Sequence, residues 1–169
     1  MNNQYPIGQL VIPNNITKTD IDQWINDIEL LPKRIHELLS NIQDEQLDNT
    51  YREGAWSVRQ LLHHIVESHL PGFMNIYLII NGKTPTHDAL PQIIQENLFE
   101  GELAYKNDLM MIEEIQSRWA NLVKDLPEES FDKTMPPSSY NQKSLKVLLC
   151  VFAWHGNHHM NHIRIALGK

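Results

Sequence analysis

The 169-residue sequence predicts an all-α protein, an up-and-down four-helix bundle preceded by an extended N-terminal arm. Apolar residues recur at helical spacing in four long stretches, and no stretch alternates with the period of two that is typical of a strand. Prolines, glycines and polar residues are concentrated between these stretches. Four amphipathic helices joined by moderate loops bury their apolar faces against one another as a bundle. No repeat or linker divides the chain, so we expect one domain over residues 1–169.

The arm and the first helix follow from the first 42 residues. Residues 1–17 hold two prolines, a glycine and several asparagines, which predicts an extended segment. Thr19 is expected to cap a helix whose apolar positions recur as far as Ile42. Pro32 lies inside this run and is expected to kink or split the helix, because proline removes a backbone hydrogen-bond donor.

The second helix has the clearest start in the sequence. Ser57 followed three residues later by Gln60 forms a capping-box pattern ahead of an apolar stripe. Pro71–Gly72 interrupts the stripe, which predicts either a kinked helix or two helices in line. Asn81–Gly82 is expected to close it, since glycine is favoured just past a helix end.

Two more helices complete the expected bundle. The third covers roughly residues 107–126 and stops before Pro127, and the fourth begins after Ser144 and ends at Leu167, with Gly168 beyond it. Large aromatic side chains on apolar stripes normally anchor a core, so all four tryptophans are expected there first: Trp24, Trp56, Trp119 and Trp154.

Composition narrows the class of function. Fourteen basic and twenty-one acidic residues give a net charge of −7, which argues against a nucleic-acid partner, since duplex binding draws on Lys and Arg contacts to phosphate. The single cysteine excludes an internal disulfide and favours a reducing compartment. No apolar run is long enough to span a membrane, and the first residues do not form a signal sequence. We therefore expect a cytoplasmic protein without a membrane partner.

Nine histidines are the unusual feature, and four of them fall within eight residues of the last predicted helix. His155, His158, His159 and His162 share one helix face with apolar residues above and below them. Imidazoles that enter a core need partners, and a divalent metal ion satisfies several at once. This pattern favours a metal site.

The spacing suggests which histidines act together. His155 and His159 lie one helical turn apart, as ligands do in helical zinc motifs, and we expect this pair to bind the ion. A third ligand should come from the second helix. Helical periodicity leaves His64 and His69 both open for this role.

Three segments of the sequence resemble the YfiT-like branch of the DinB superfamily: Tyr51–His69, Tyr5–Gly8 and Ala153–Ile163. The resemblance implies a four-helix bundle, often a homodimer, with one divalent metal on three histidines and the activity of a metal-dependent hydrolase. Carried over by position, it implies His64, His155 and His159 as the ligands. The sequence departs from the family's pattern at Asp88–Leu103 and at Pro136–Ser138, so the substrate is expected to differ from that of close relatives.

Three histidine ligands leave an open position on the ion, which is the mark of a catalytic site. Such a site activates water for hydrolysis of a small molecule, with Glu67 or Glu53 as the general base. It can equally ionise a low-molecular-weight thiol such as bacillithiol, as S-transferases of the superfamily do. Arg52 and Arg59 are available to bind an anionic thiol.

The remaining expectations concern the ion and the alternatives to catalysis. Zinc or nickel is expected, with iron(II) and manganese(II) also compatible, because imidazole binds all of them and availability influences which is bound. His158 and His162 are expected to hold the ligands in place rather than to bind the ion. A non-catalytic metal-binding stress protein is the third hypothesis for the whole chain.

Overall fold

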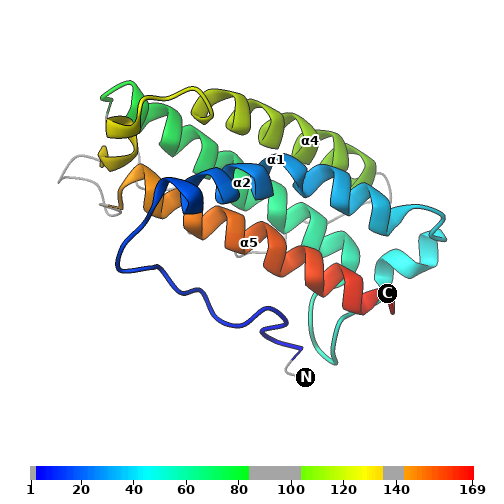
Figure 1. The fold of residues 1–169 in the computed structure, drawn as a ribbon. Coiled ribbons are helices and arrows are strands. Elements are labelled where there is room, and N and C mark those ends of the chain that lie inside the picture. Colours follow the sequence, from blue (N-terminus) through cyan, green and yellow to red (C-terminus); the bar gives the residue numbers. More distant parts are fainter. Residues whose placement is uncertain (1–2, 84–103, 135–142) are drawn as a thin grey trace.

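The computed structural model describes residues 3–83, 104–134 and 143–169. Its four long helices form a bundle (Figure 1): α1 (Lys18–Leu39), α2 (Val58–Ile80), α4 (Ala104–Val123) and α5 (Leu145–Ala166). Two short 3-10 helices, η1 (Asp44–Asp48) and η2 (Glu128–Asp132), precede α2 and α5. Over the described ranges, β pairing is limited to two isolated bridges, and none of the helices is long and apolar enough to cross a membrane. The predicted all-α four-helix bundle is confirmed.

The helix directions differ from simple up-and-down alternation. In Figure 1, α1 and α5 run one way, and α2 and α4 run the other way. Helices α1 and α2 each pack against both α4 and α5. Although α1 and α2 are consecutive in the sequence, they therefore lie diagonally opposite each other in the bundle. A parallel α2–α4 pair requires a connection that returns along the bundle. The 23 residues from 81 to 103 are long enough, since α4 has 20 residues and a helix of that size is about 30 Å long.

Helix α1 begins two residues earlier than the sequence suggested. Its N-cap is Thr17, which forms a capping box with Asp20, so the expected start at Thr19 was wrong. The carboxylate of Asp20 accepts from both the backbone N–H and the hydroxyl of Thr17, which satisfies the exposed start of the helix. The helix runs through Pro32 as one element and ends at Leu39.

Helix α2 starts as predicted and is not split. The Ser57–Gln60 capping box is present, and α2 continues across Pro71 to Ile80. Gly82 follows with φ of 63°, the left-handed conformation expected at the helix end. Gly72 faces Phe152 of α5, and a Cβ at this position would lie 2.3 Å from Phe152 Cζ. Glycine therefore allows α2 and α5 to approach closely just beyond the histidine cluster.

The other helix ends lie within three residues of those expected. Helix α4 spans Ala104–Val123 and α5 begins after its N-cap Ser144. Trp119 is fully buried between the helices, whereas Trp56 is 42% exposed, so its expected place in the core was wrong. Trp24 and Trp154 are partly buried. The two departures from the family's pattern, at Asp88–Leu103 and Pro136–Ser138, lie outside the described residues.

Candidate metal centre

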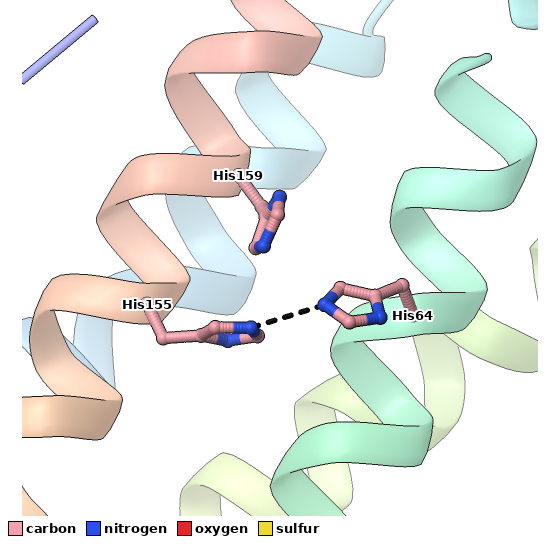
Figure 2. A group of neighbouring side chains, drawn as sticks. All are labelled: His64, His155 and His159. Carbon is pink, nitrogen blue, oxygen red and sulfur yellow. Dashed lines mark hydrogen bonds between the residues drawn. The ribbon is translucent and has the colours of Figure 1, made fainter. Parts of the chain in front are cut away.

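Three histidines from two helices meet where α2 and α5 run antiparallel. Figure 2 shows His64 of α2 opposite His155 and His159 of α5. The Nε2 atoms of His64 and His155 are 3.1 Å apart, and one nitrogen from each of the three rings lies within 4.8 Å of the others. Two nitrogens bound to one tetrahedral zinc ion are separated by about 3.3 Å, given Zn–N bonds of about 2.0 Å. The three rings are thus spaced so that they could hold a metal ion.

Burial keeps these rings in the form that binds metals. Loss of water, with a smaller contribution from neighbouring histidine charges, lowers the pKa of His64 to about 4 and that of His159 to about 2. The same two causes hold the pKa of His155 well below its usual value. All three imidazoles are therefore neutral near pH 7 and each offers a lone pair, as a metal ligand must.

His69, the other α2 histidine that periodicity allowed, lies behind His155. It is fully buried, and its Nε2 is 3.0 Å from Nδ1 of His155, the ring nitrogen that faces away from His64. Its own Nδ1 is 2.5 Å from Nε2 of Gln116 in α4. Sequence reasoning missed Gln116, although a polar residue within the apolar stripe of the third helix was a signal that could have found it.

The remaining histidines of α5 form a second group with His159. His158, His159 and His162 are all buried, and one nitrogen from each lies within the same 4.8 Å limit. Nδ1 of His162 is 3.4 Å from Nδ1 of His159. The ring of Tyr51 stacks on His162 with centroids 3.8 Å apart. His159 belongs to both groups and therefore links them.

The predicted base is part of a separate polar cluster. Glu67 Oε1 lies 3.1 Å from Nε2 of His63, and Nδ1 of His63 lies 3.1 Å from Oδ1 of Asp108 in α4. Burial raises the pKa of Asp108, while the adjacent His63 opposes that rise. This cluster joins α2 to α4 on the side of α2 next to His64, and a catalytic role for Glu67 or Glu53 stays a prediction.

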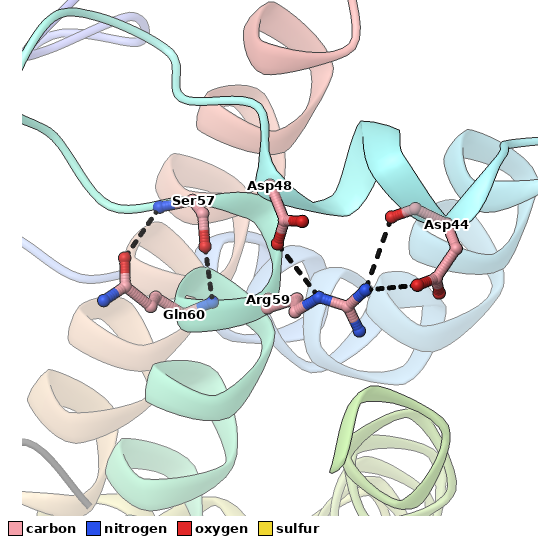
Figure 3. Close-up of polar contacts among 5 residues, drawn as sticks. All are labelled: Asp44, Asp48, Ser57, Arg59 and Gln60. Atoms are coloured by element: carbon pink, nitrogen blue, oxygen red, sulfur yellow. Dashed lines mark hydrogen bonds and ion pairs between the residues drawn. The ribbon is translucent and has the colours of Figure 1, made fainter. Parts of the chain in front are cut away.

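The two predicted substrate-binding arginines have different surroundings. Figure 3 shows Arg59 between Asp44 and Asp48, with nitrogen–oxygen distances of 2.7 and 3.1 Å, beside the α2 capping box. These ion pairs fasten η1 to the first turn of α2. Arg52 is exposed and lies over the ring of Tyr51, with 5.5 Å from its Cζ to the ring centroid. Substrate binding by either arginine stays a prediction.

An exposed aromatic side chain borders the centre. The ring of Trp56 lies 4.5 Å from that of His64 and 6.2 Å from that of His159, centroid to centroid. Its position just before the α2 capping box places it against two members of the first group. Trp56 is therefore a surface residue beside the candidate site.

Comparisons with known proteins agree with this architecture. A family model described as DinB superfamily matches residues 27–163. A protein of Halalkalibacterium halodurans is 36% identical over 99% of this chain and 98% of its own length, and one of Oceanobacillus iheyensis is 33% identical over 96% and 95%. Both bear the name "Putative metal-dependent hydrolase".

A solved structure extends the likeness to the fold. It is 27% identical, covers 98% of this chain and 96% of its own, and superposes with a TM-score of 0.80. It is described as "YfiT from Bacillus subtilis", "a probable metal-dependent hydrolase with an unusual four-helix bundle topology". Sequence and fold together show that the chain belongs to the DinB superfamily.

Proposed function

We propose that this protein is a metal-dependent hydrolase of small molecules in which His64, His155 and His159 bind one divalent ion. The observation that carries the proposal is the convergence of three neutral imidazoles from two helices. The Nε2 atoms of His64 and His155 are 3.1 Å apart, and a nitrogen of His159 lies within 4.8 Å of the other two rings' ligand nitrogens. The names of the relatives from two bacterial species point to the same chemistry.

The donor set fits such an ion. Neutral nitrogen donors suit zinc and nickel, which we propose as the ions bound, and they also accept iron(II) or manganese(II). When bound, the ion would act as a Lewis acid with an open position, lowering the pKa of a water or a thiol there. Because no ligand is charged, the site would keep the ion's full double charge for this purpose.

The neighbouring residues have separate tasks in this proposal. The hydroxyl of Ser68 lies 3.4 Å from Nε2 of His64, so with an ion bound there it would be placed to donate a hydrogen bond to a molecule on the ion. The exposed ring of Trp56 offers an apolar surface to the substrate next to two ligands. Glu67 would act as general base only after leaving His63, its present partner.

A specific observation favours a second candidate, a low-molecular-weight-thiol S-transferase such as one using bacillithiol. Among the described residues, the hydrogen-bond contacts of the three ligand rings outside their own group are to Ser68, His69 and His162, and none of these is a carboxylate. A thiol ionised on a metal ion needs no such base, since the ion itself lowers the thiol pKa. Arg52 is exposed, and we propose it, with Arg59 as the other candidate, to bind an anionic thiol.

Metal analysis tests the site first. We expect untagged protein to carry about one zinc or nickel per chain by elemental mass spectrometry, and His64→Ala, His155→Ala and His159→Ala to lose it. His36→Ala is the matched control, because His36 is half exposed on α1. Full occupancy in the three variants would contradict the assignment.

Activity assays then separate the reactions. The metal-loaded protein would be offered esters and amides, and separately bacillithiol with an electrophilic acceptor. Turnover of esters or amides supports the hydrolase, and thiol consumption alone supports the S-transferase. Tight metal binding with neither activity would identify a non-catalytic metal-binding protein. Light scattering of the same sample tests the homodimer that we also propose.

A further inference from the structure

A buried hydrogen-bond chain leads away from the candidate metal centre into the core. It runs from His155 of α5 to His69 of α2 and then to Gln116 of α4, with successive nitrogen–nitrogen distances of 3.0 and 2.5 Å. His69 and Gln116 are fully buried. Three helices thus contribute to the orientation of one ligand ring.

The bound state fixes the direction of this chain. If Nε2 of His155 binds an ion, the ring hydrogen must be on Nδ1, and it faces Nε2 of His69. His69 is fully buried, and burial favours the uncharged ring, so its Nε2 can accept. The hydrogen of His69 is then on Nδ1, which requires an acceptor on Gln116. The only acceptor of that side chain is its amide oxygen, Oε1.

The structure has the opposite direction. Gln116 presents its Nε2 to His69, so the amide donates to Nδ1 of His69. With neutral rings, this amide orientation implies that Nε2–H of His69 donates to Nδ1 of His155 and that Nε2–H of His155 donates to Nε2 of His64, since both nitrogen pairs lie at hydrogen-bond distance. In the part of the chain that the structure describes, Oε1 of Gln116 is buried without a hydrogen-bond partner. A half-turn of the amide exchanges its oxygen and nitrogen and brings that oxygen to His69.

We propose that His69 and Gln116 are positioning residues for His155, and that ion binding reverses the direction of the hydrogen bonds. Without the ion, Gln116 donates to His69 and His69 donates to His155; with the ion bound, His155 donates to His69 and His69 donates to Gln116. The proposal rests on the three-histidine site proposed above. Groups that accept the free N–H of a metal-bound histidine fix its tautomer and orientation, and their loss typically weakens metal binding about 10- to 100-fold. His69 therefore contributes to the site without binding the ion.

The protons balance in this reversal. His155 and His69 each carry one ring hydrogen in both states. The hydrogen on Nε2 of each ring is replaced by one on Nδ1 of the same ring, and Gln116 turns without gaining or losing a proton. The two rings together release no net proton.

Zinc affinity, measured by competition with a chelator, tests the positioning role. His69→Leu should weaken zinc binding about 10- to 100-fold, while His69→Gln should stay within a few-fold of wild type because its amide oxygen can accept from His155. Gln116→Leu should weaken binding about tenfold. Gln116→Glu should bind at least as tightly as wild type, because a carboxylate presents only acceptors to His69. Gln23→Leu, at an exposed position of α1, is the matched control.

A packing role predicts a different pattern, with both Gln116 variants binding less tightly in proportion to their loss of stability. Thermal unfolding of each metal-free variant supplies that comparison. Equal zinc affinity in wild type and His69→Leu would overturn the positioning role while leaving the three-histidine site intact. Failure of wild type itself to bind zinc would overturn both.

Nitrogen-15 NMR of the imidazole rings tests the reversal directly, without an activity assay. His69 should carry its hydrogen on Nε2 in the metal-free protein and on Nδ1 after one equivalent of zinc. The His69→Gln spectrum assigns the ring signals by difference. A His69 tautomer that does not change on zinc binding would overturn the reversal.

Discussion

At the residue scale, the environment of each histidine decides its chemistry more than its position in the sequence does. His64 and His69 are five residues apart on α2, and both face the interior. His64 contacts Nε2 of His155, whereas His69 contacts Nδ1 of the same ring. Periodicity could not separate these roles, because it reports which face a residue occupies and not what the partner helix presents there.

Trp56 provides a residue-scale prediction, because it is the exposed tryptophan that touches the centre. Its ring lies 4.5 Å from that of His64, so a paramagnetic ion on His64 should quench its emission strongly. We expect copper(II) or nickel(II) to reduce the tryptophan fluorescence of wild type, and Trp56→Phe to lose most of that decrease.

Trp24→Phe serves as the control, since Trp24 lies on α1, the helix that supplies none of the three proposed ligands. Titration at 295 nm excitation with and without a chelator gives the measurement. Equal quenching in wild type and Trp56→Phe would show that the ion binds elsewhere.

At the element scale, the helix ends were the features that the sequence predicted best. The Ser57 capping box and the glycine after α2 are local signals, and both are present in the structure. The sequence left a kink or a split open at Pro32 and at Pro71, and neither helix is split. Each proline costs local hydrogen bonding, but both helices gain extensive burial against the bundle. Local signals therefore fix the ends, and packing decides what happens between them.

The caps give a matched pair of substitutions. The Ser57 side chain accepts from the backbone N–H of Gln60, whereas Ser144 caps α5 without a side-chain hydrogen bond. Ser57→Ala should therefore lower the free energy of unfolding by about 1 kcal/mol, and Ser144→Ala by only a few tenths. Urea denaturation of the metal-free proteins measures both, and equal losses would argue against the cap as the cause.

The close contact of α2 with α5 is tested at Gly72. A Cβ there would lie 2.3 Å from Phe152 Cζ, so Gly72→Ala should destabilise the fold by about 1–3 kcal/mol through overpacking, despite alanine's better helix propensity. Phe152→Leu shortens the opposing side chain. The alanine substitution should cost less in that background, and a double-mutant cycle with no coupling would contradict the contact.

At the scale of the whole molecule, the order of helix directions is what assembles the centre. α5 packs parallel to α1 and antiparallel to α2, so the start of α2 lies beside the last turns of α5 (Figure 1). The sequence predicted four helices but not this arrangement, because the 23-residue connection from 81 to 103 permits α4 to run either way. His64 and the α5 pair, His155 and His159, are 91 and 95 positions apart in the chain, and they meet only because this register aligns them.

The many buried histidines should make the metal-free protein acid-sensitive. The pKa falls from 6.5 to about 4 for His64 and His158, to about 3 for His69 and to about 2 for His159, with burial as the largest cause. Between these values and 6.5 the unfolded chain binds protons that the native state does not. Stability should therefore be complete above pH 6.5 and fall as the pH decreases from there towards 4.

The window from pH 6.5 to 5 isolates this effect, since most carboxylates titrate below it. Each histidine that is protonated only on unfolding adds a slope of roughly 1.4 kcal/mol per pH unit to the free energy of unfolding. Urea denaturation at several pH values should give a steep slope for wild type and the same slope for His36→Gln, whose side chain is half exposed. His69→Leu should reduce the slope by about 1.4 kcal/mol per pH unit, the contribution of one histidine. If the free energy of unfolding of wild type did not change between pH 6.5 and 5, the histidine cluster would be protonated in the native state. The rings would then not be the neutral ligands that a metal ion requires.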